Sequence, residues 1–188
     1  MKSPNWKSCS EEELWKFVAF HFAKAGIETI LVGGSVVSIY SEGIYKSGDI
    51  DMVLNTYSRM NDAEEIMKSI GFQKFSTRYF KHPKCDHLFV EFLHPPVMIG
   101  DDAKNIKLEK VEVEKYSIKI LSPTDCIKDR LASFIYFKSR ECLDQALLVA
   151  NRQKFNMKDV EAWSKQEGNP LAMKGFKEFK DAFLKSSV

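Results

Sequence analysis

Residues 28–54 contain the pattern that most constrains the fold of this chain. The apolar run TILV stops at Gly33-Gly34, a short apolar stretch with helical spacing (SVVSIY) follows, and a second apolar run, DIDMVL, begins at Asp49. Side chains at positions i and i+2 of a strand point to the same side. The pattern therefore predicts a strand, a glycine turn, a short helix and a second strand, with Asp49 and Asp51 on one face of that second strand.

The two aspartates and the glycines indicate related chemistry. Adjacent carboxylates repel each other and lose hydration, and a bound cation offsets both costs. Hard divalent ions such as Mg²⁺ prefer carboxylate oxygens and recruit substrate phosphates. Glycines let a ligand approach the backbone, and Ser35 opens a helix whose first N–H groups suit a phosphate. Either motif alone is more often a turn or a solvated strand end; in this order they indicate a site for a nucleoside triphosphate and a metal.

Composition sets broad limits on the protein. With 188 residues, 44% of them hydrophobic, the chain is long enough for one well-buried domain, or one domain with a small annex. The formal charge of +2 neither demands nor excludes nucleic-acid binding, so any such affinity must come from a local patch. The four cysteines lack framework spacing, as is typical of free thiols in a reducing compartment. Because the N-terminal residues are polar and no long apolar run occurs, we expect a soluble, cytoplasmic protein without a membrane segment.

Local signals predict the elements of the first two thirds of the chain. Ser10 and Glu13 form a capping-box pattern before an amphipathic helix that ends near Gly26. Asn61 or Asp62 is expected to cap a helix that ends at Gly71. The runs 72–80 and 88–93 predict strands separated by the breaker HPKCDH, and the alternation at 107–121 predicts a hairpin.

The pattern changes at Ser122-Pro123, after which apolar residues recur at helical spacing. We expect helices near 123–137, 140–152, 156–166 and 170–184. The predicted fold class is α+β (mixed α/β), with a mixed sheet flanked by helices. The predicted domains are a core of residues 1–121 and a helical C-terminal part, residues 122–188, packed on that core.

The GGS motif followed by the D-I-D pair resembles the signature of the nucleotidyltransferase superfamily, which shares its fold with DNA polymerase beta. Within it the chain looks most similar to the bacterial AbiEii-like group, toxins of type IV toxin–antitoxin systems and their uncharacterised relatives, over residues 30–150. The resemblance implies a nucleotidyltransferase-like core in which Gly33, Gly34 and Ser35 contact the triphosphate. It also implies that Asp49 and Asp51 ligate Mg²⁺ or Mn²⁺.

The superfamily takes a third carboxylate from a later strand that lies beside the first two. The candidate here is Glu91, the one charge in the apolar run LFVEFL. Burying that charge is costly without a partner, and an ion already held by two aspartates would be one. Asp86 is a weaker candidate because its loop is already polar. The alternative for Glu91 is an edge-strand glutamate that faces water.

AbiEii-like proteins also carry a basic residue and then an R/K-D-x-x-D cluster on helices after the sheet. Arg130 falls where the family has lysine, Arg140-Glu141 with Asp144 falls on the later cluster, and Lys46 stands where many relatives have arginine. These departures keep the charge but change the geometry. The resemblance implies that Lys46, Arg130 and Arg140 contact the triphosphate or the acceptor. Alternatively, the residues after the sheet tie two helices together through ion pairs.

Three other groups have simpler interpretations. The segment 82–87 contains two histidines, a cysteine and an aspartate but lacks a second ligand cluster at zinc spacing, so a polar hairpin turn is favoured. Aromatic residues at 79, 80, 89 and 92 could stack a base, yet alternating aromatics in strands are more often core. The lysine-rich tail helix has a stripe of phenylalanines that is expected to pack on the domain.

The leading hypothesis is a metal-dependent nucleotidyltransferase that moves a nucleoside monophosphate from an NTP to an acceptor hydroxyl and releases pyrophosphate. RNA is the expected acceptor, because basic residues gather after Ser122: Lys128, Arg130, Lys138, Arg140, Arg152 and Lys154. The toxin resemblance implies that this acceptor is a tRNA end. An antitoxin is a further partner that the resemblance implies. The alternatives are a non-catalytic nucleotide- or partner-binding relative of the same fold and a small-molecule (antibiotic) adenylyltransferase.

Overall fold

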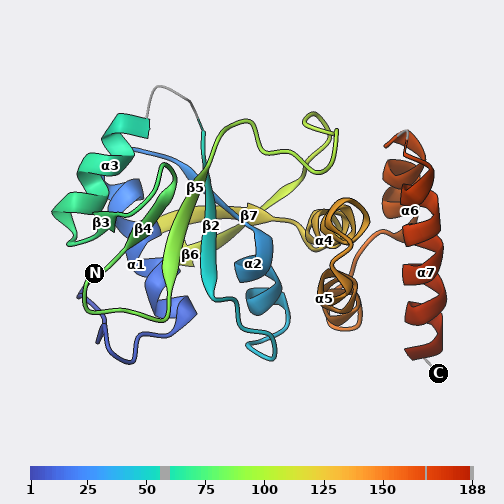
Figure 1. Cartoon of the computed structure of the whole chain (residues 1–188), viewed down its shortest axis with the longest axis horizontal. Helices are drawn as coiled ribbons and strands as arrows, with labels where there is room; N and C mark the ends of the chain where they lie inside the picture. The colour runs from blue at the N-terminus through green and yellow to red at the C-terminus, as the bar shows by residue number, and fades with distance from the viewer. Residues whose placement is uncertain (56–59, 168, 187–188) are drawn as a thin grey trace. The chain divides into compact units, whose positions relative to one another are not determined.

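The structure is a computed structural model that describes residues 1–55, 60–167 and 169–186. The chain forms two compact units, which are described separately below (Figure 1). The first comprises residues 1–35, 46–97 and 108–120, and the second comprises residues 36–45, 98–107 and 121–188. Within the described residues, no helix is both long enough and apolar enough to span a bilayer. The division into domains at residue 121 stays a prediction.

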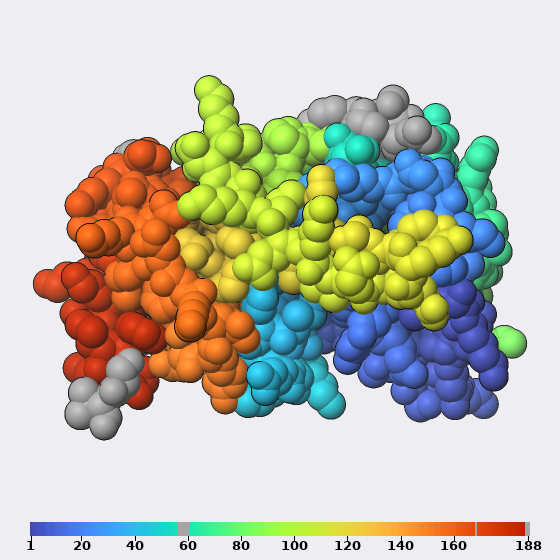
Figure 2. Space-filling view, turned by 180° about the vertical axis from the view of Figure 1, so that it is seen from behind, coloured from blue at the N-terminus to red at the C-terminus, as the bar shows by residue number. Residues whose placement is uncertain are grey.

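A mixed sheet forms the centre of the first unit, and its described strands run in the order β3-β4-β5-β2-β1-β7-β6. Strand β2 pairs antiparallel with β1 and parallel with β5, and β1 pairs parallel with β7. The predicted hairpin of β6 and β7 forms one edge, shown in yellow in Figure 2. The strands are β1 (Thr29–Val32), β2 (Asp49–Leu54), β3 (Gln73–Lys74), β4 (Tyr79–Lys81), β5 (Phe89–Leu93), β6 (Leu108–Val113) and β7 (Tyr116–Leu121).

Helices α1 (Glu11–Lys24) and α3 (Met60–Ser69) lie on the same side of this sheet (Figure 1). The face of the sheet toward α1 is apolar: Ile50 and Met52 of β2 are fully buried, and Phe22 of α1 lies with its ring centroid 5.0 Å from that of Phe92 on β5. Burial of each such side chain stabilises the fold by about 1.5–3 kcal/mol. Because side chains alternate along a strand, Asp49 and Asp51 point away from this apolar face.

The first helix begins as its sequence predicts. The Ser10 hydroxyl accepts a hydrogen bond from the Glu13 N–H at 3.1 Å, and the Glu13 carboxylate accepts one from the Ser10 N–H at 2.8 Å. This reciprocal pair is a capping box, and it satisfies two N–H groups that the helix itself leaves without partners.

The helices of the second unit also match the prediction closely. They are α4 (Pro123–Phe137), α5 (Arg140–Ala150), α6 (Met157–Gln166) and α7 (Pro170–Ser186). Their core contains fully buried apolar side chains from each helix, including Leu131, Leu143, Val160 and Phe179. Helix α2 (Gly33–Tyr40) starts in the first unit and ends in the second, where the Tyr40 hydroxyl donates to the Leu121 carbonyl at 2.8 Å.

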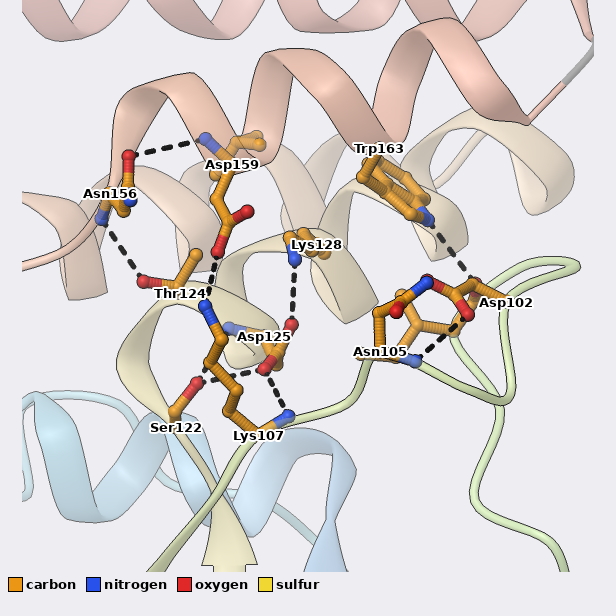
Figure 3. A network of polar contacts seen from close by, with 12 residues as sticks. Asp102, Asn105, Lys107, Ser122, Thr124, Asp125, Lys128, Asn156, Asp159 and Trp163 are labelled. Carbon is orange, nitrogen blue, oxygen red and sulfur yellow. Dashed lines mark hydrogen bonds and ion pairs between the residues drawn. The ribbon is translucent and has the colours of Figure 1, made fainter.

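A network of polar contacts surrounds Asp125 at the start of α4 (Figure 3). The Asp125 carboxylate accepts hydrogen bonds from the Lys107 backbone N–H at 2.7 Å, the Ser122 hydroxyl at 2.9 Å and the Lys128 ammonium at 2.9 Å. The Lys107 ammonium in turn contacts Asp159 of α6 at 2.8 Å. The side chains of Asp125 and Lys128 are only 2% and 6% exposed, so the charge of Lys128 is neutralised within the unit.

Two predicted features of the first unit are wrong in detail. Helix α3 begins at Met60, so Asn61 and Asp62 lie inside its first turn and do not precede it; residues 56–59 lie outside the described residues. The run 72–80 is not one strand but two, β3 and β4, because the chain reverses at residues 75–78, where the Phe75 N–H donates to the Tyr79 carbonyl at 3.1 Å. The polar turn at 82–87 joins β4 to β5 as predicted.

Candidate active site

The junction of β1 and α2 is shaped by Gly33. This residue has a φ of +68°, which side chains of L-residues disfavour, and a Cβ atom built there would collide with the carboxylate of Asp51. Strand pairing explains the approach, since Val32, the residue before Gly33, is the register partner of Asp51. Glycine is therefore required at position 33, because the Asp51 carboxylate lies where the Cβ atom of any other residue would be.

Asp49 is held at the start of β2 by two serines. The Ser47 hydroxyl donates to the Asp49 carboxylate at 2.7 Å, and the Ser35 hydroxyl donates to the Asp49 backbone carbonyl at 3.1 Å. The Ser47 N–H donates in turn to the carboxylate of Glu11 on α1 at 2.8 Å. Both aspartates remain partly exposed, so their carboxylates are accessible to a ligand. The loop before β2 is thus tied to the helix layer while the acidic pair stays open.

Glu91 lies beside the acidic pair. It is the register partner of Asp51 in the parallel pairing of β2 with β5, which puts the two side chains on the same face of the sheet. Glu91 is 7% exposed, and its carboxylate contacts the Arg78 guanidinium at 2.9 Å. The Tyr79 hydroxyl also bonds to Glu91, and this contact raises the pKa of the Tyr79 phenol. Glu91 is therefore a buried, ion-paired carboxylate on the acidic face and not an edge residue turned to water.

The side chains of the described residues form no group of three or more His, Cys, Asp or Glu that could hold a metal ion. Two carboxylates are nevertheless enough for Mg²⁺, which keeps several waters and takes its other ligands from substrate phosphates. The pair Asp49 and Asp51, partly exposed on one face, fits such an ion. Glu91 lies on the same face and is engaged by Arg78.

The predicted phosphate contacts differ in their accessibility. Gly33, Gly34 and Ser35 form the start of α2, and all three are buried. The Ser35 hydroxyl is committed to the Asp49 carbonyl, so it positions α2 against β2. Backbone N–H groups at the helix start are the groups here that suit a phosphate. Lys46 is exposed in the loop before β2, three residues from Asp49.

Arg130 and Arg140 belong to the second unit, whereas the acidic residues belong to the first. Arg130 is only 13% exposed and contacts Asp129 at 2.6 Å and Gln145 of α5 at 3.3 Å. Arg140 on α5 forms an ion pair with Glu178 of α7. The Arg130–Asp129 ion pair lies within α4, whereas the contacts to Gln145 and Glu178 join helices, as in the alternative in which the basic residues after the sheet have a structural role. Their predicted contact with the triphosphate or acceptor stays a prediction.

Sequence inspection missed Glu11, Ser47 and Arg78, each of which holds a part of this site. Glu11 had a plain interpretation as an acidic residue in the first turn of a helix. Arg78 stood within a run assigned to one strand, where its neighbours gave no reason to pair it with Glu91. A hairpin assigned at residues 75–78 would have put Arg78 and Tyr79 beside β5.

Comparisons with known proteins bear on the fold of the chain. No family model and no curated protein sequence matches the chain. Among solved structures, a nucleotidyltransferase-like antigenic protein from Paracoccidioides brasiliensis aligns with a TM-score of 0.67 at 13% identity, covering 95% of this chain and 92% of that one.

Two further solved structures align over most of their length. The lincosamide antibiotic adenylyltransferase LnuA, in its lincomycin-bound form, gives a TM-score of 0.53 at 13% identity, over 77% of this chain and 98% of that one. The antibiotic-resistance factor ANT(2'')-Ia gives 0.54 at 10% identity, over 93% and 94%. The chain therefore has the mixed α/β fold of the nucleotidyltransferases.

Proposed function

We propose that the protein is a metal-dependent nucleotidyltransferase, which transfers a nucleoside monophosphate from an NTP to an acceptor hydroxyl. The observation that carries this proposal is the placement of Asp49 and Asp51 on one open face of β2, with the Asp51 carboxylate packed against the glycine turn that starts α2. This arrangement puts carboxylates for a cation next to backbone N–H groups for a phosphate, in a chain with the nucleotidyltransferase fold.

Asp49 and Asp51 would hold Mg²⁺ or Mn²⁺, which when bound supplies positive charge to the phosphates of the NTP. The N–H groups at the start of α2, at Gly33, Gly34 and Ser35, orient the triphosphate, and Lys46 supplies a nearby cation from the exposed loop. Gly33 leaves room for the Asp51 carboxylate beside the start of α2, and the hydrogen bond from Ser47 holds Asp49.

The transfer exchanges one bond to phosphorus for another. The acceptor oxygen bonds to the α-phosphorus, the bond from that phosphorus to the oxygen bridging to the β-phosphate breaks, and pyrophosphate leaves. The acceptor proton passes to a carboxylate, for which Glu91 is placed on the same face as Asp51. The ion pair with Arg78 holds the Glu91 side chain in position before the acceptor arrives.

For the acceptor we propose RNA, plausibly a tRNA end as the resemblance to AbiEii-like toxins implies, with an antitoxin as a protein partner. Of the six basic residues between Lys128 and Lys154 on which this acceptor rests, four are exposed: Lys138, Arg140, Arg152 and Lys154. Lys128 and Arg130 do not present their charge, because the first is buried against Asp125 and the second against Asp129. The four cysteines are free and buried, which supports a reducing compartment such as the cytoplasm.

A small hydroxylated molecule is the second candidate acceptor. LnuA is described as an adenylyltransferase for lincosamide antibiotics, and this chain aligns with nearly all of it. Because Lys128 and Arg130 are buried in ion pairs, less basic surface remains to bind a polyanion such as RNA. A non-catalytic, nucleotide-binding relative is the third candidate. The ion pair between Arg78 and Glu91 supports it, because a paired Glu91 is less available as a third catalytic carboxylate.

The test is incubation of the protein with Mg²⁺, each α-labelled NTP in turn and total cellular RNA. We expect label from one NTP to become macromolecular with wild-type protein and with Asp86→Asn, an exposed control, but not with the double variant Asp49→Asn, Asp51→Asn. Thermal unfolding with Mg²⁺ and NTP gives a second measurement, since a ligand at about 100 times its Kd adds about 2.7 kcal/mol of stability. A double variant that is stabilised as much as wild type would place the nucleotide site elsewhere.

A further inference from the structure

Three aromatic rings gather on the acidic face of the sheet, outside the hydrophobic core. Phe75, Tyr79 and Phe89 contact one another, with ring centroids 5.7 Å apart for Phe75 and Tyr79, 5.5 Å for Tyr79 and Phe89, and 6.3 Å for Phe75 and Phe89. We call these three residues the ring cluster. By contrast, Phe80 and Phe92, whose side chains alternate to the opposite face, are 3% and 0% exposed.

The ring cluster is open to solvent. Phe75 is 58% exposed, and Tyr79 and Phe89 are half-buried. Burial of a phenylalanine side chain stabilises a fold, and Phe75 gains little of this stabilisation because most of its side chain is exposed. A phenylalanine ring that packs against two other rings and remains exposed to solvent can stack against the flat ring of a ligand.

Strand register puts the ring cluster directly beside the carboxylates. Phe89 is the register partner of Asp49, and Tyr79 is the register partner of Glu91. Neighbouring strands lie about 4.8 Å apart. A base that stacks on this cluster therefore lies within about one or two strand spacings of Asp49 and Asp51. It lies on the face of the sheet that also carries Glu91.

The surrounding sequence is basic. Residues 73–84 (QKFSTRYFKHPK) contain four cations and no acidic residue. Lys74 is paired with Glu64 of α3 and lies on the face of Phe80, so the cations left for the ring cluster are Arg78, Lys81 and Lys84. Arg78 is 43% exposed, and an arginine carries five N–H donors, so its contact with Glu91 leaves donors for a phosphate. Exposed rings interleaved with cations are the combination that holds single-stranded nucleic acids, in which bases stack on aromatic faces and phosphates meet the cations.

We infer that the ring cluster is the acceptor subsite and that it takes an unpaired base at the end of a single-stranded RNA. This inference rests on the proposed function and extends it by locating the acceptor on β4 and β5 of the first unit. The terminal base stacks on Phe75, Tyr79 and Phe89, a backbone phosphate contacts Arg78, and the terminal hydroxyl meets the α-phosphate above Asp49 and Asp51.

The first test measures binding without catalysis. A fluorescein-labelled single-stranded RNA oligonucleotide is titrated with the protein, and an abasic oligonucleotide of equal length serves as the probe that keeps the phosphates and lacks the bases. Since stacking contributes about 1–3 kcal/mol per base, Phe75→Ala should weaken RNA binding about 5- to 150-fold. Phe75→Trp should restore binding, and Phe137→Ala, which removes an 81% exposed ring in the second unit, should leave it unchanged.

The second measurement is the transfer of label to the same RNA by the wild type and by Phe75→Ala. We expect a raised KM for RNA, with stabilisation by Mg²⁺ and NTP unchanged. If the abasic probe binds as tightly as the RNA, or if Phe75→Ala binds and transfers like wild type, the subsite is refuted even when the enzyme is active. If Phe75→Ala loses RNA binding but the wild-type protein transfers no label, the result would support the subsite and refute the proposed function. Transfer only to a small ring compound would overturn RNA as the occupant.

Discussion

At the scale of single residues, the site depends on groups that approach each other where a side chain would intervene. Gly33 combines a left-handed backbone conformation with the close approach of the Asp51 carboxylate. Gly48 offers a contrast, because a Cβ atom at that position would meet nothing within 4 Å. Gly33 is the first residue of the short helix α2, Gly48 lies in the segment between α2 and β2, and only Gly33 is required by its surroundings.

We predict that Gly33→Ala lowers the free energy of unfolding by about 1–3 kcal/mol, because alanine is strained at positive φ and its methyl group displaces Asp51. It should also reduce the stabilisation by Mg²⁺ and NTP. Urea unfolding with and without these ligands measures both effects. Gly48→Ala is the matched control and should change neither quantity; equal losses in the two variants would show that the approach of Asp51 does not matter.

At the scale of the element, helix starts with similar sequences differ in how they are capped. Ser10 precedes α1 and Ser139 precedes α5, and both have extended backbone conformations. Ser10 accepts the N–H of Glu13, whereas the side chain of Ser139 makes no capping hydrogen bond. The difference matters for the site, because Glu11 in the first turn of α1 accepts the N–H of Ser47 next to the acidic pair.

Ser10→Ala is expected to reduce stability by about 1 kcal/mol, since the cap hydrogen bond to Glu13 is lost. The corresponding change Ser139→Ala removes no such bond and should stay within about 0.5 kcal/mol of wild type. Chemical unfolding of the two variants under one set of conditions makes the comparison. Equal destabilisation would mean that the capping box does not hold α1 in solution.

At the scale of the whole molecule, buried histidines couple folding to pH. Burial lowers the pKa of His82 below its ordinary value of 6.5, and nearby Lys84 adds to the effect. The His82 ring stacks on Trp6 with centroids 3.8 Å apart, and its Nδ1 accepts the Lys84 N–H at 3.2 Å, as only an unprotonated nitrogen can. Burial likewise lowers the pKa of His21, with the N-terminus and Lys24 contributing.

A histidine with a lowered pKa in the folded state binds its proton more readily when the chain unfolds. Stability is therefore fully present above the ordinary pKa of about 6.5 and falls as the pH drops below it, by at most about 1.4 kcal/mol per pH unit for each histidine. Urea unfolding between about pH 7.5 and 5.5 should show this slope. His82→Gln should flatten it. A slope unchanged in His82→Gln would assign the pH dependence to other groups.

Local signals in the sequence determined most of the elements. The capping box at Ser10, the acidic strand at 49–54, the hairpin at 107–121 and the helices after Ser122 follow from short-range periodicity, caps and turns, which act within a few residues. The same reasoning put Asp49 and Asp51 on one face, because alternation along a strand needs no knowledge of its neighbours. It missed the reversal at 75–78, where no glycine or proline marks the turn.

Only the tertiary structure decided which side chains meet across strands and helices. Register between β2 and β5 placed Glu91 beside Asp51, and the hairpin of β3 and β4 brought Arg78 to Glu91. Packing also decided that Arg130 is largely buried, although its sequence context suited an exposed phosphate contact equally well. Such pairings depend on strand order and burial, which are set by the packing of the whole unit. Residue type and spacing along the chain do not determine these pairings between side chains.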